Sequence, residues 1–345
     1  MGQAALIPCC TLVATIKVLE SPIEGCFIVT IDNLIFEVKG VVHPKDRIIA
    51  YLRYIPSIDS DSGFRKVYNL EERENYLREN YPDYLWYSEP YGRLIQSVSM
   101  NKIESILDPV DYLAQLQSTD KITHLEQVSV TLAKKLVETT EIDWRDIGLT
   151  GSQLIGVAGK DSDIDLVIYG SSACRKFYSN LSARINSILE IEKYSGKLLE
   201  DHVSFRWGAH NELRSLLLEI ERDKLLQGLI GNYHFFIRLV KTPSDLDYDY
   251  GDLSYQMLGH QKVSGKVIDS SDSIFTPCEY QVTCVSNPNL EKLVSYRGRF
   301  TEHVSAEDKF EAFGRLELVI DHKVDSQYMQ LVLGELPSDY LIPIK

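Results

Sequence analysis

The sequence predicts an α+β protein of several domains, with a central α/β core between an N-terminal α+β domain and a small all-β domain at the C-terminus. Its 345 residues exceed the usual length of one domain. Helical and strand-like periods alternate in the middle of the chain, and short strand-like runs separated by turn residues fill the C-terminal part. We therefore expect domains at 1–120, 121–250 and 251–345.

The composition is typical of a globular protein, and its charge limits the kinds of binding partner to expect. Apolar residues make up 44% of the chain, charged residues 25%, and the formal net charge is −14. This acidic balance argues against a broad surface for duplex DNA, but it is compatible with RNA held by a local basic patch. The six cysteines include no Cys-x-x-Cys pair, which favours reduced intracellular thiols over a zinc site.

The first apolar stretch, residues 4–18, does not have the features of a membrane or export signal. It is short, contains Pro8 and lacks a basic start. We therefore expect no membrane partner and a cytoplasmic location.

In the N-terminal domain, alternating apolar residues predict strands, and capping residues predict helices. Asp32-Asn33 interrupts the second strand run and indicates a hairpin turn, and Asn69 followed by Glu72 is typical of a helix start. The expected strands are 11–18, 27–38 and 46–54, and the expected helices are 69–79, 102–107 and 110–117.

A basic and aromatic cluster lies on the strands of this domain. We interpret it as ordinary strand-face residues, with contact to a phosphate-bearing acceptor as the alternative. Its members are Tyr51, Arg53, Tyr54, Arg65, Lys66 and Tyr68.

The central domain shows long helical periods around two short strands. Asp120 is the expected cap of the first helix, and Gly231-Asn232 is expected to end the last one. The expected helices are 122–139, 152–157, 171–189 and 211–229, and the expected strands are 147–150, 163–169 and 234–240.

The candidate site lies on the second of these strands. Residues i and i+2 of a strand point to the same face, so Asp163 and Asp165 project together. Two carboxylates on one face suit Mg²⁺, a hard cation that prefers oxygen ligands and binds phosphates. Gly151 and Ser152 open the preceding short helix, whose free N–H groups suit a phosphate.

A Gly-Ser pair followed about ten residues later by Asp-x-Asp between apolar residues resembles the DNA polymerase β-like nucleotidyltransferase superfamily. Gly151, Ser152, Asp163 and Asp165 match this signature. The whole chain also resembles an uncharacterised archaeal group of predicted nucleotidyltransferases. The resemblance implies a polymerase β-like core, with Asp163 and Asp165 as catalytic metal ligands and Gly151 and Ser152 at the nucleotide phosphates.

One departure concerns the third metal-binding carboxylate, which the family usually places on a later strand. The family pattern there is Asp-Ile-Arg-Leu, whereas this chain has Phe236-Ile237-Arg238-Leu239. The alternative sources of an acid are Asp201, Asp245, Asp247 and Asp249, none of which matches by spacing.

Short strand runs separated by Gly, Pro, Asn and Asp predict a small β sandwich or barrel at the C-terminus. They lie at 262–268, 280–285, 292–296, 315–321 and 328–333. Residues 296–300, Tyr-Arg-Gly-Arg-Phe, are interpreted as a turn with two exposed arginines, with RNA phosphate binding as the alternative.

These observations predict an Mg²⁺-dependent nucleotidyltransferase that transfers a nucleoside monophosphate from a nucleoside triphosphate and releases pyrophosphate. RNA, a protein hydroxyl and a small molecule all remain open as acceptors. The alternative is a catalytically impaired module that binds nucleotide or RNA, which the phenylalanine at position 236 favours.

Overall fold

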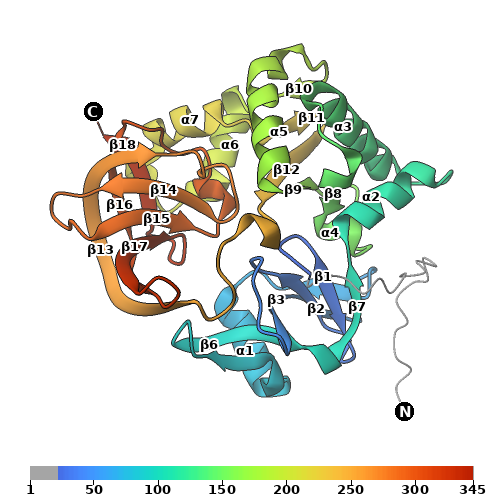
Figure 1. Cartoon of the computed structure of the whole chain (residues 1–345). Helices are drawn as coiled ribbons and strands as arrows, with labels where there is room; N and C mark the ends of the chain where they lie inside the picture. Colours follow the sequence, from blue (N-terminus) through green and yellow to red (C-terminus); the bar gives the residue numbers. More distant parts are fainter. Residues whose placement is uncertain (1–21, 345) are drawn as a thin grey trace.

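The computed structural model describes residues 22–344, and the predicted strand at 11–18 lies outside them. Three β-sheets organise the described residues, with helices packed mainly around the middle sheet (Figure 1). The protein is therefore a mixture of α and β structure, as the sequence predicts. The domain boundaries at 120/121 and 250/251 stay predictions.

The first sheet has the strand order β5-β6-β3-β2-β1-β7, with β4 paired to β3. The predicted turn is confirmed, because Asn33 has a φ of 58° between β1 and β2. Asn69 caps α1 (Leu70–Asn80) by accepting from the backbone N–H of Glu71 at 2.8 Å. The strands are β1 (Phe27–Thr30), β2 (Ile35–Val38), β3 (Arg47–Pro56), β4 (Phe64–Lys66), β5 (Leu85–Ser88), β6 (Arg93–Ser99) and β7 (Ile103–Leu107).

The predicted helix at 102–107 is wrong, because these residues form β7. They pair antiparallel with β1, so that Phe27 lies opposite Leu107. A run of six residues is too short for its period to separate helix from strand, and the tertiary pairing decides. The predicted helix after it is confirmed as α2 (Pro109–Ser118), which Asp108 caps.

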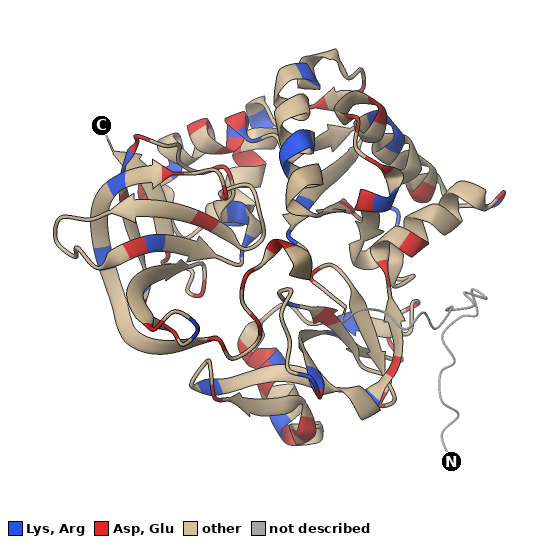
Figure 2. Cartoon of the chain, viewed as in Figure 1, with Lys and Arg blue, Asp and Glu red and all other residues tan. Residues whose placement is uncertain are grey.

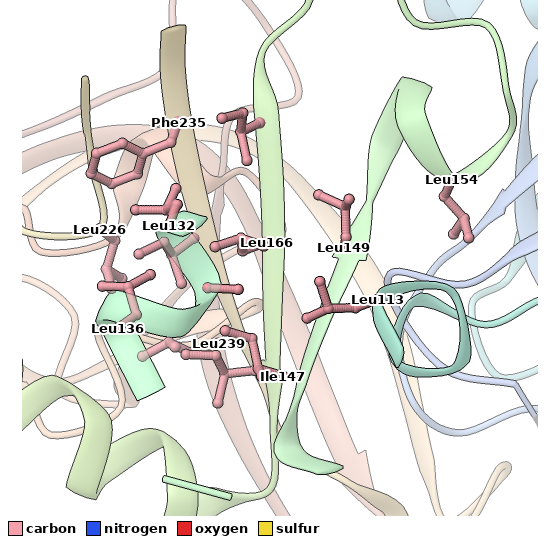
Figure 3. Close-up of a cluster of buried hydrophobic side chains, with 14 of the residues drawn as sticks. Leu113, Leu132, Leu136, Ile147, Leu149, Leu154, Leu166, Leu226, Phe235 and Leu239 are labelled. Carbon is pink, nitrogen blue, oxygen red and sulfur yellow. The ribbon is translucent and has the colours of Figure 1, made fainter. Parts of the chain in front are cut away.

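The middle sheet has the order β10-β11-β12-β9-β8, in which β9 lies between antiparallel β8 and parallel β12. Figure 3 shows Leu132 and Leu136 of α3 beside Leu166 and Leu239 of this sheet, within one large buried cluster. The strands are β8 (Ile147–Thr150), β9 (Ile164–Tyr169), β10 (Ile191–Glu192), β11 (Gln227–Ile230) and β12 (Tyr233–Val240). The helices are α3 (His124–Thr140), α4 (Gly151–Leu154) and α5 (Ser171–Arg184).

Two helix predictions here need correction. Thr123, not Asp120, caps α3, because it forms a capping box with Glu126. The predicted helix at 211–229 ends early, as α7 (Arg214–Asp223), and is followed by β11. Gly231-Asn232 is a hairpin turn between β11 and β12 rather than a helix stop, since Ile230 pairs with Tyr233. The sequence analysis also missed α6 (Gly196–Trp207).

The third sheet has the order β13-β14-β15-β17-β16-β18. Each predicted strand run overlaps an observed strand, but β13 is much longer than expected and β18 was missed. β13 pairs along its length with β16, from Leu253 opposite Asp321 to Lys266 opposite Lys309. The strands are β13 (Leu253–Asp269), β14 (Cys278–Thr283), β15 (Leu290–Ser295), β16 (Lys309–Asp321), β17 (Ser326–Leu333) and β18 (Tyr340–Ile344).

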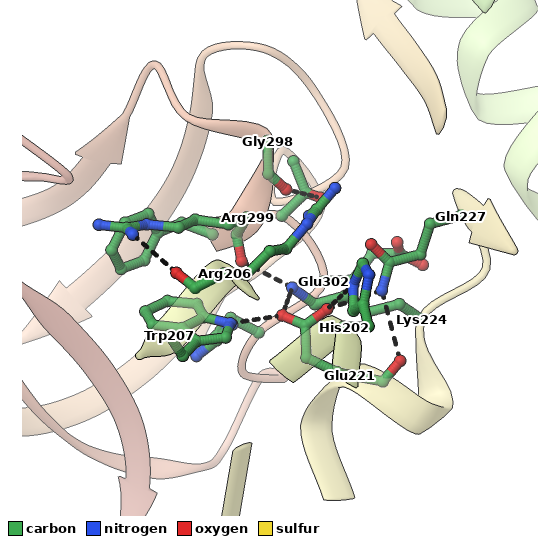
Figure 4. Close-up of polar contacts among 12 residues, drawn as sticks. His202, Arg206, Trp207, Glu221, Lys224, Gln227, Gly298, Arg299 and Glu302 are labelled. Carbon is green, nitrogen blue, oxygen red and sulfur yellow. Dashed lines mark hydrogen bonds and ion pairs between the residues drawn. The ribbon is translucent and has the colours of Figure 1, made fainter. Parts of the chain in front are cut away.

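A buried polar cluster joins α6 and α7 to the third sheet (Figure 4). The Glu221 carboxylate accepts from Trp207 Nε1 at 2.9 Å and from Lys224 Nζ at 2.8 Å. Lys224 Nζ also donates to the carbonyl of Arg299 at 2.6 Å. The two bonds to Glu221 are buried and the bond from Lys224 to Arg299 is partly buried, so these contacts connect the loop around residue 299 to the segment before β11.

The N-terminal sheet lies against one face of the middle sheet. Thr150 Oγ1 donates to the carbonyl of Gly25 at 2.6 Å, and the Tyr169 hydroxyl donates to the carbonyl of Glu24 at 3.1 Å. Val41 packs there against Val167 and Val240. Asp165 lies on the same strand as Val167, two residues earlier, so this is the face that carries Asp165.

Candidate active site

The structure brings Asp163 and Asp165 to the start of β9. Asp163 directly precedes the strand and is exposed, whereas Asp165 is its second residue and is half-buried. Ile164, Leu166 and Ile168 are fully buried on the opposite face, against the helices. Alternation along the strand therefore presents both carboxylates on the face away from α3 and α5.

Gly151 lies directly beside the Asp165 side chain. Antiparallel pairing places Thr150 opposite Asp165, and Gly151 follows with a φ of 72°. A Cβ on Gly151 would overlap Oδ2 of Asp165 and lie 3.1 Å from its Cβ. Position 151 thus needs glycine both for its backbone conformation and for its closeness to the carboxylate.

Ser152 occupies the first turn of α4, next to this contact, and is half-buried. Its carbonyl accepts from the N–H of Val157 at 3.0 Å, which closes the turn after the helix. The observed helix has four residues instead of the predicted six. Gly151, Ser152 and Asp165 are therefore adjacent, as the sequence analysis expected, at the crossing from β8 to β9.

Burial raises the pKa of Asp165, and the neighbouring charges of Asp163 and Glu37 raise it further. The opposite charges of Arg238 and Lys66 act against this rise. A cation bound beside Asp165 would stabilise the ionised form of this carboxyl group, which burial disfavours.

Phe236 takes the position where the family pattern has an acid. Parallel pairing of β12 with β9 sets Phe236 directly beside Asp165. Its ring lies 5.4 Å from the Arg206 guanidinium carbon and close against Gly298, where an added Cβ would clash with it. Phe236 therefore supports the contact between the middle sheet and the loop after β15.

The alternative acids do not replace it. Because β9 and β12 are parallel, residues that follow β12 lie at the opposite end of the sheet from Asp163. There Asp245 Oδ2 accepts from the N–H groups of Ser171 and Thr242, at 2.9 and 2.7 Å. Asp201 pairs with Lys197 along α6. Among residues 22–344, no group of three or more His, Cys, Asp and Glu side chains is placed to hold a metal ion.

An ion-pair network that the sequence analysis missed borders the site. Arg238, on the same strand face as Phe236, lies 2.7 Å from Glu24 and 3.2 Å from Glu37. Lys39 contacts both carboxylates, at 3.0 and 2.7 Å. Glu24 and Glu37 are far from Arg238 in the sequence, so the network could not be predicted from spacing. The sequence indicated only that Arg238 shares the strand face of residue 236.

These charges control the ionisation of Glu37. Burial opposes its charged form, but Lys39, Arg238 and Arg53 together hold the pKa of Glu37 well below its usual range. Glu37 is thus a permanent negative charge in the folded protein at neutral pH, within electrostatic reach of Asp165.

The comparisons with known proteins bear on the class of protein to which this segment is similar. The model of the nucleotidyltransferase domain family matches residues 133–227, a segment that contains α4, β9 and the Asp163-x-Asp165 pair. This match confirms the resemblance to nucleotidyltransferases.

A protein of Methanocaldococcus jannaschii with the name "Uncharacterized protein MJ1086" is 26% identical over 325 residues, which cover 89% of this chain and 94% of that protein. This similarity agrees with the archaeal group that the sequence resembles. No solved structure matches the chain. Within residues 22–344, no helix has the length and apolar character needed to cross a membrane.

Proposed function

We propose that the protein is an Mg²⁺-dependent nucleotidyltransferase that transfers a nucleoside monophosphate from a nucleoside triphosphate to a hydroxyl acceptor and releases pyrophosphate. The observation that carries the proposal is the placement of Asp163 and Asp165 at the start of β9, beside Gly151, inside the segment that matches the family model. We also propose the polymerase β-like arrangement of a central core with flanking domains, and a cytoplasmic location.

The carboxylates of Asp163 and Asp165 are suitable ligands for an Mg²⁺ ion that is bound together with a nucleotide. Mg²⁺ is commonly held by one or two carboxylates together with substrate phosphates and water, and Asp163 and Asp165 supply two such carboxylates. When bound, the ion neutralises phosphate charge and polarises the phosphorus for attack. Gly151 gives the phosphates room beside Asp165, and the Ser152 hydroxyl and backbone N–H groups are the donors nearest to them.

The remaining catalytic work in this proposal is positioning. Phe236 and Arg238 both lie on β12, the strand beside Asp165, so an apolar ring and a guanidinium paired with Glu37 border this carboxylate. Such fixed charges act without reorganising during the reaction, which is the main source of rate enhancement in phosphoryl transfer.

The second candidate function is a nucleotide- or RNA-binding module without turnover. Phe236 favours it, because an apolar ring stands beside Asp165 where the family has its third acid, and Asp245 and Asp201 are engaged elsewhere. In this alternative the two carboxylates still hold a nucleotide with its Mg²⁺, but no transfer follows.

The proposal is tested by titration calorimetry with each nucleoside triphosphate, with and without Mg²⁺, together with a pyrophosphate-release assay. We expect Mg²⁺-dependent binding and slow pyrophosphate release in the wild type, and loss of both in Asp163→Asn and Asp165→Asn. Asp161→Asn is the matched control, since Asp161 is an exposed acid in the preceding turn. Binding without release across a panel of acceptors supports the module, and unchanged binding in both variants overturns the site.

A further inference from the structure

Two basic and aromatic segments that are far apart in the sequence meet around the carboxylate pair. One comprises Arg53, Lys66 and Tyr68 around the hairpin of β3 and β4, and the other comprises Tyr296 and Arg297 after β15. The sequence analysis treated each as ordinary surface. The first segment adjoins Asp165, and the second adjoins Phe236, the residue that pairs with Asp165.

The first segment presents an exposed ring between two cations. Tyr68 is 72% exposed, with Lys66 Nζ 5.0 Å and the Arg53 guanidinium carbon 6.0 Å from its ring centre. Arg53 is the extra residue of a β-bulge, since Ile35 pairs with Tyr54 and the next residue pairs with Leu52. Bulges redirect a side chain out of the regular alternation, and here the bulge turns a guanidinium toward Tyr68.

The backbone beneath Tyr68 is held in place. The Arg73 guanidinium donates to the carbonyls of Val67 and Tyr68, at 2.9 and 3.3 Å. Arg65, the neighbour of Lys66, is exposed and pairs with Glu72 at 2.8 Å instead. Lys66 therefore lies beside the Tyr68 ring, whereas the adjacent Arg65 is paired with Glu72.

This segment borders the carboxylates directly. Burial and the nearby Arg53 lower the pKa of Lys66, while the charges of Asp165 and Asp163 act to raise it. Among the described residues Lys66 forms no ion pair, so its ammonium group is available to a ligand that approaches Asp165.

The second segment is connected to the site through Phe236. Gly298 touches the ring of Phe236, the residue paired with Asp165. The preceding Arg297 is exposed, donates to the carbonyl of Gly334 at 3.3 Å, and makes no ion pair within the described part of the chain. Tyr296 beside it is 46% exposed, and its hydroxyl lies near Tyr91, Tyr248 and Tyr255.

The two segments lie within electrostatic reach of each other. Burial and the charge of Arg53 lower the pKa of Arg73 to about 10, and Arg297 of the second segment contributes to this shift. Elsewhere on the chain, lysine and arginine are interspersed with aspartate and glutamate, as Figure 2 shows for one view. Arg53 pairs with Glu37 at 3.6 Å, whereas Lys66 and Arg297 form no ion pair within residues 22–344 of a chain whose net charge is −14.

Cations interleaved with exposed aromatic rings are the features that bind single-stranded nucleic acid. The cations contact phosphates, and the rings stack on unpaired bases regardless of sequence. A small-molecule acceptor does not require two such segments near the site, and a protein acceptor offers no row of phosphates.

We propose that the acceptor is a single-stranded polynucleotide, with its backbone on Arg53, Lys66 and Arg297 and a base stacked on Tyr68. This inference rests on the proposed function. A terminal ribose hydroxyl would then reach Asp163 and Asp165. Its oxygen forms a bond to the α-phosphorus, the bond from that phosphorus to the bridging oxygen breaks, pyrophosphate leaves, and the hydroxyl proton passes to solvent.

The test is fluorescence anisotropy of the full chain with a labelled, mixed-sequence single-stranded oligoribonucleotide, without nucleoside triphosphate. We expect binding that weakens steeply between about 50 and 200 mM salt. Tyr68→Ala should weaken it by roughly 5- to 100-fold, the usual effect of losing one stacked base, and Tyr68→Phe should retain it. Lys66→Ala and Arg297→Ala should each reduce the slope of log affinity against log salt by about 0.7–1.

The matched controls are Arg65→Ala, which removes the neighbouring cation, and Tyr87→Ala, which removes another exposed ring. Neither should change affinity or salt slope. Absence of binding at about 50 mM salt, equal losses in the controls, or equally tight binding of the matched duplex overturns the proposal. So does transfer of label from an α-labelled triphosphate to protein alone. Since the binding assay contains no triphosphate, its failure leaves the titration of nucleotide and Mg²⁺ to judge the proposed function separately.

Discussion

The guanidinium of Arg238 lies 2.7 Å from the carboxylate of Glu24, and this ion pair joins β12 to the N-terminal part of the chain on the face that carries Asp165. Glu24 is almost completely buried, and its second oxygen accepts from the N–H of Gly40 at 2.8 Å. The pair is thus part of the contact between two sheets rather than a surface interaction. We therefore expect mutation of either residue to lower the stability of the fold.

Arg238→Met should destabilise the protein by about 3–5 kcal/mol, because it leaves Glu24 and Glu37 with reduced compensation in a buried place. Urea unfolding measures the change. Arg145→Met is the control, since Arg145 is an exposed arginine whose loss should cost no more than about 0.5 kcal/mol. Equal midpoints for the two variants would show that the network contributes little.

Glu37 should make folding sensitive to acid. Its folded pKa is well below the usual range, so its contribution to stability is complete above the unfolded value, about 4.3, and is lost as the pH falls toward the folded value. Unfolding midpoints measured from neutral pH down to about pH 3 should fall less steeply in Glu37→Gln than in the wild type. Glu138→Gln, on the exposed side of α3, should follow the wild-type curve.

Asp165→Asn should stabilise the metal-free protein while removing its response to ligand. The raised pKa of Asp165 means that folding disfavours its charged form, so the relative penalty grows as the pH rises through the folded value. At neutral pH we expect a melting temperature roughly 1–3 °C higher than in the wild type. Addition of Mg²⁺ and triphosphate should then raise the wild-type melting temperature only. A lower melting temperature in the metal-free variant would contradict the assigned origin of the pKa shift.

Gly151→Ala should impair nucleotide binding beyond its cost in stability. Gly156→Ala is a closely matched control, because Gly156 has the same φ of 72° but nothing within 4 Å of an added Cβ. Both variants should lose about 1–2 kcal/mol from the left-handed backbone. Only Gly151→Ala displaces the Asp165 carboxylate, so calorimetry should show a further loss of Mg²⁺-triphosphate affinity in that variant alone.

Phe236→Asp should add a third carboxylate beside Asp165 and increase affinity for a second divalent ion. It should also lower stability, because the ring no longer fills the space against Gly298 and Arg206. Phe236→Leu separates the two effects, since it reduces the packing without adding charge. Metal titrations at saturating triphosphate decide the matter, and tight binding of two ions by the wild type would reveal a ligand outside those considered above.

The sequence predicted the proximity of those candidate-site residues that are local in the chain. Gly151, Ser152, Asp163 and Asp165 lie within one strand-turn-strand unit, so spacing and period were enough to place them together. The contributions of Glu24, Glu37 and Gly298 could not be predicted in this way, because each comes from a separate sheet and depends on how the sheets pack.

The errors in secondary structure have a related cause. β7 and β11 are short strands whose conformation is decided by partners elsewhere in the chain or across a tight turn. Their own residues carry too few periods to distinguish helix from strand. Where a strand signal was a longer, mostly apolar run followed by Pro243, as in β12, the prediction was confirmed.

The N-terminal sheet packs against the face of the middle sheet that carries Asp165, and this packing limits how the chain can be truncated. A fragment that begins after residue 120 would expose Val167 and Val240 to solvent, although both are fully buried in the intact chain. It would also lack Glu24 and Glu37, the acids that pair with Arg238. Such a fragment is expected to aggregate rather than to serve as a minimal enzyme. The segment that matches the nucleotidyltransferase family is therefore not a portable module here, and truncation experiments need to keep its neighbours with it.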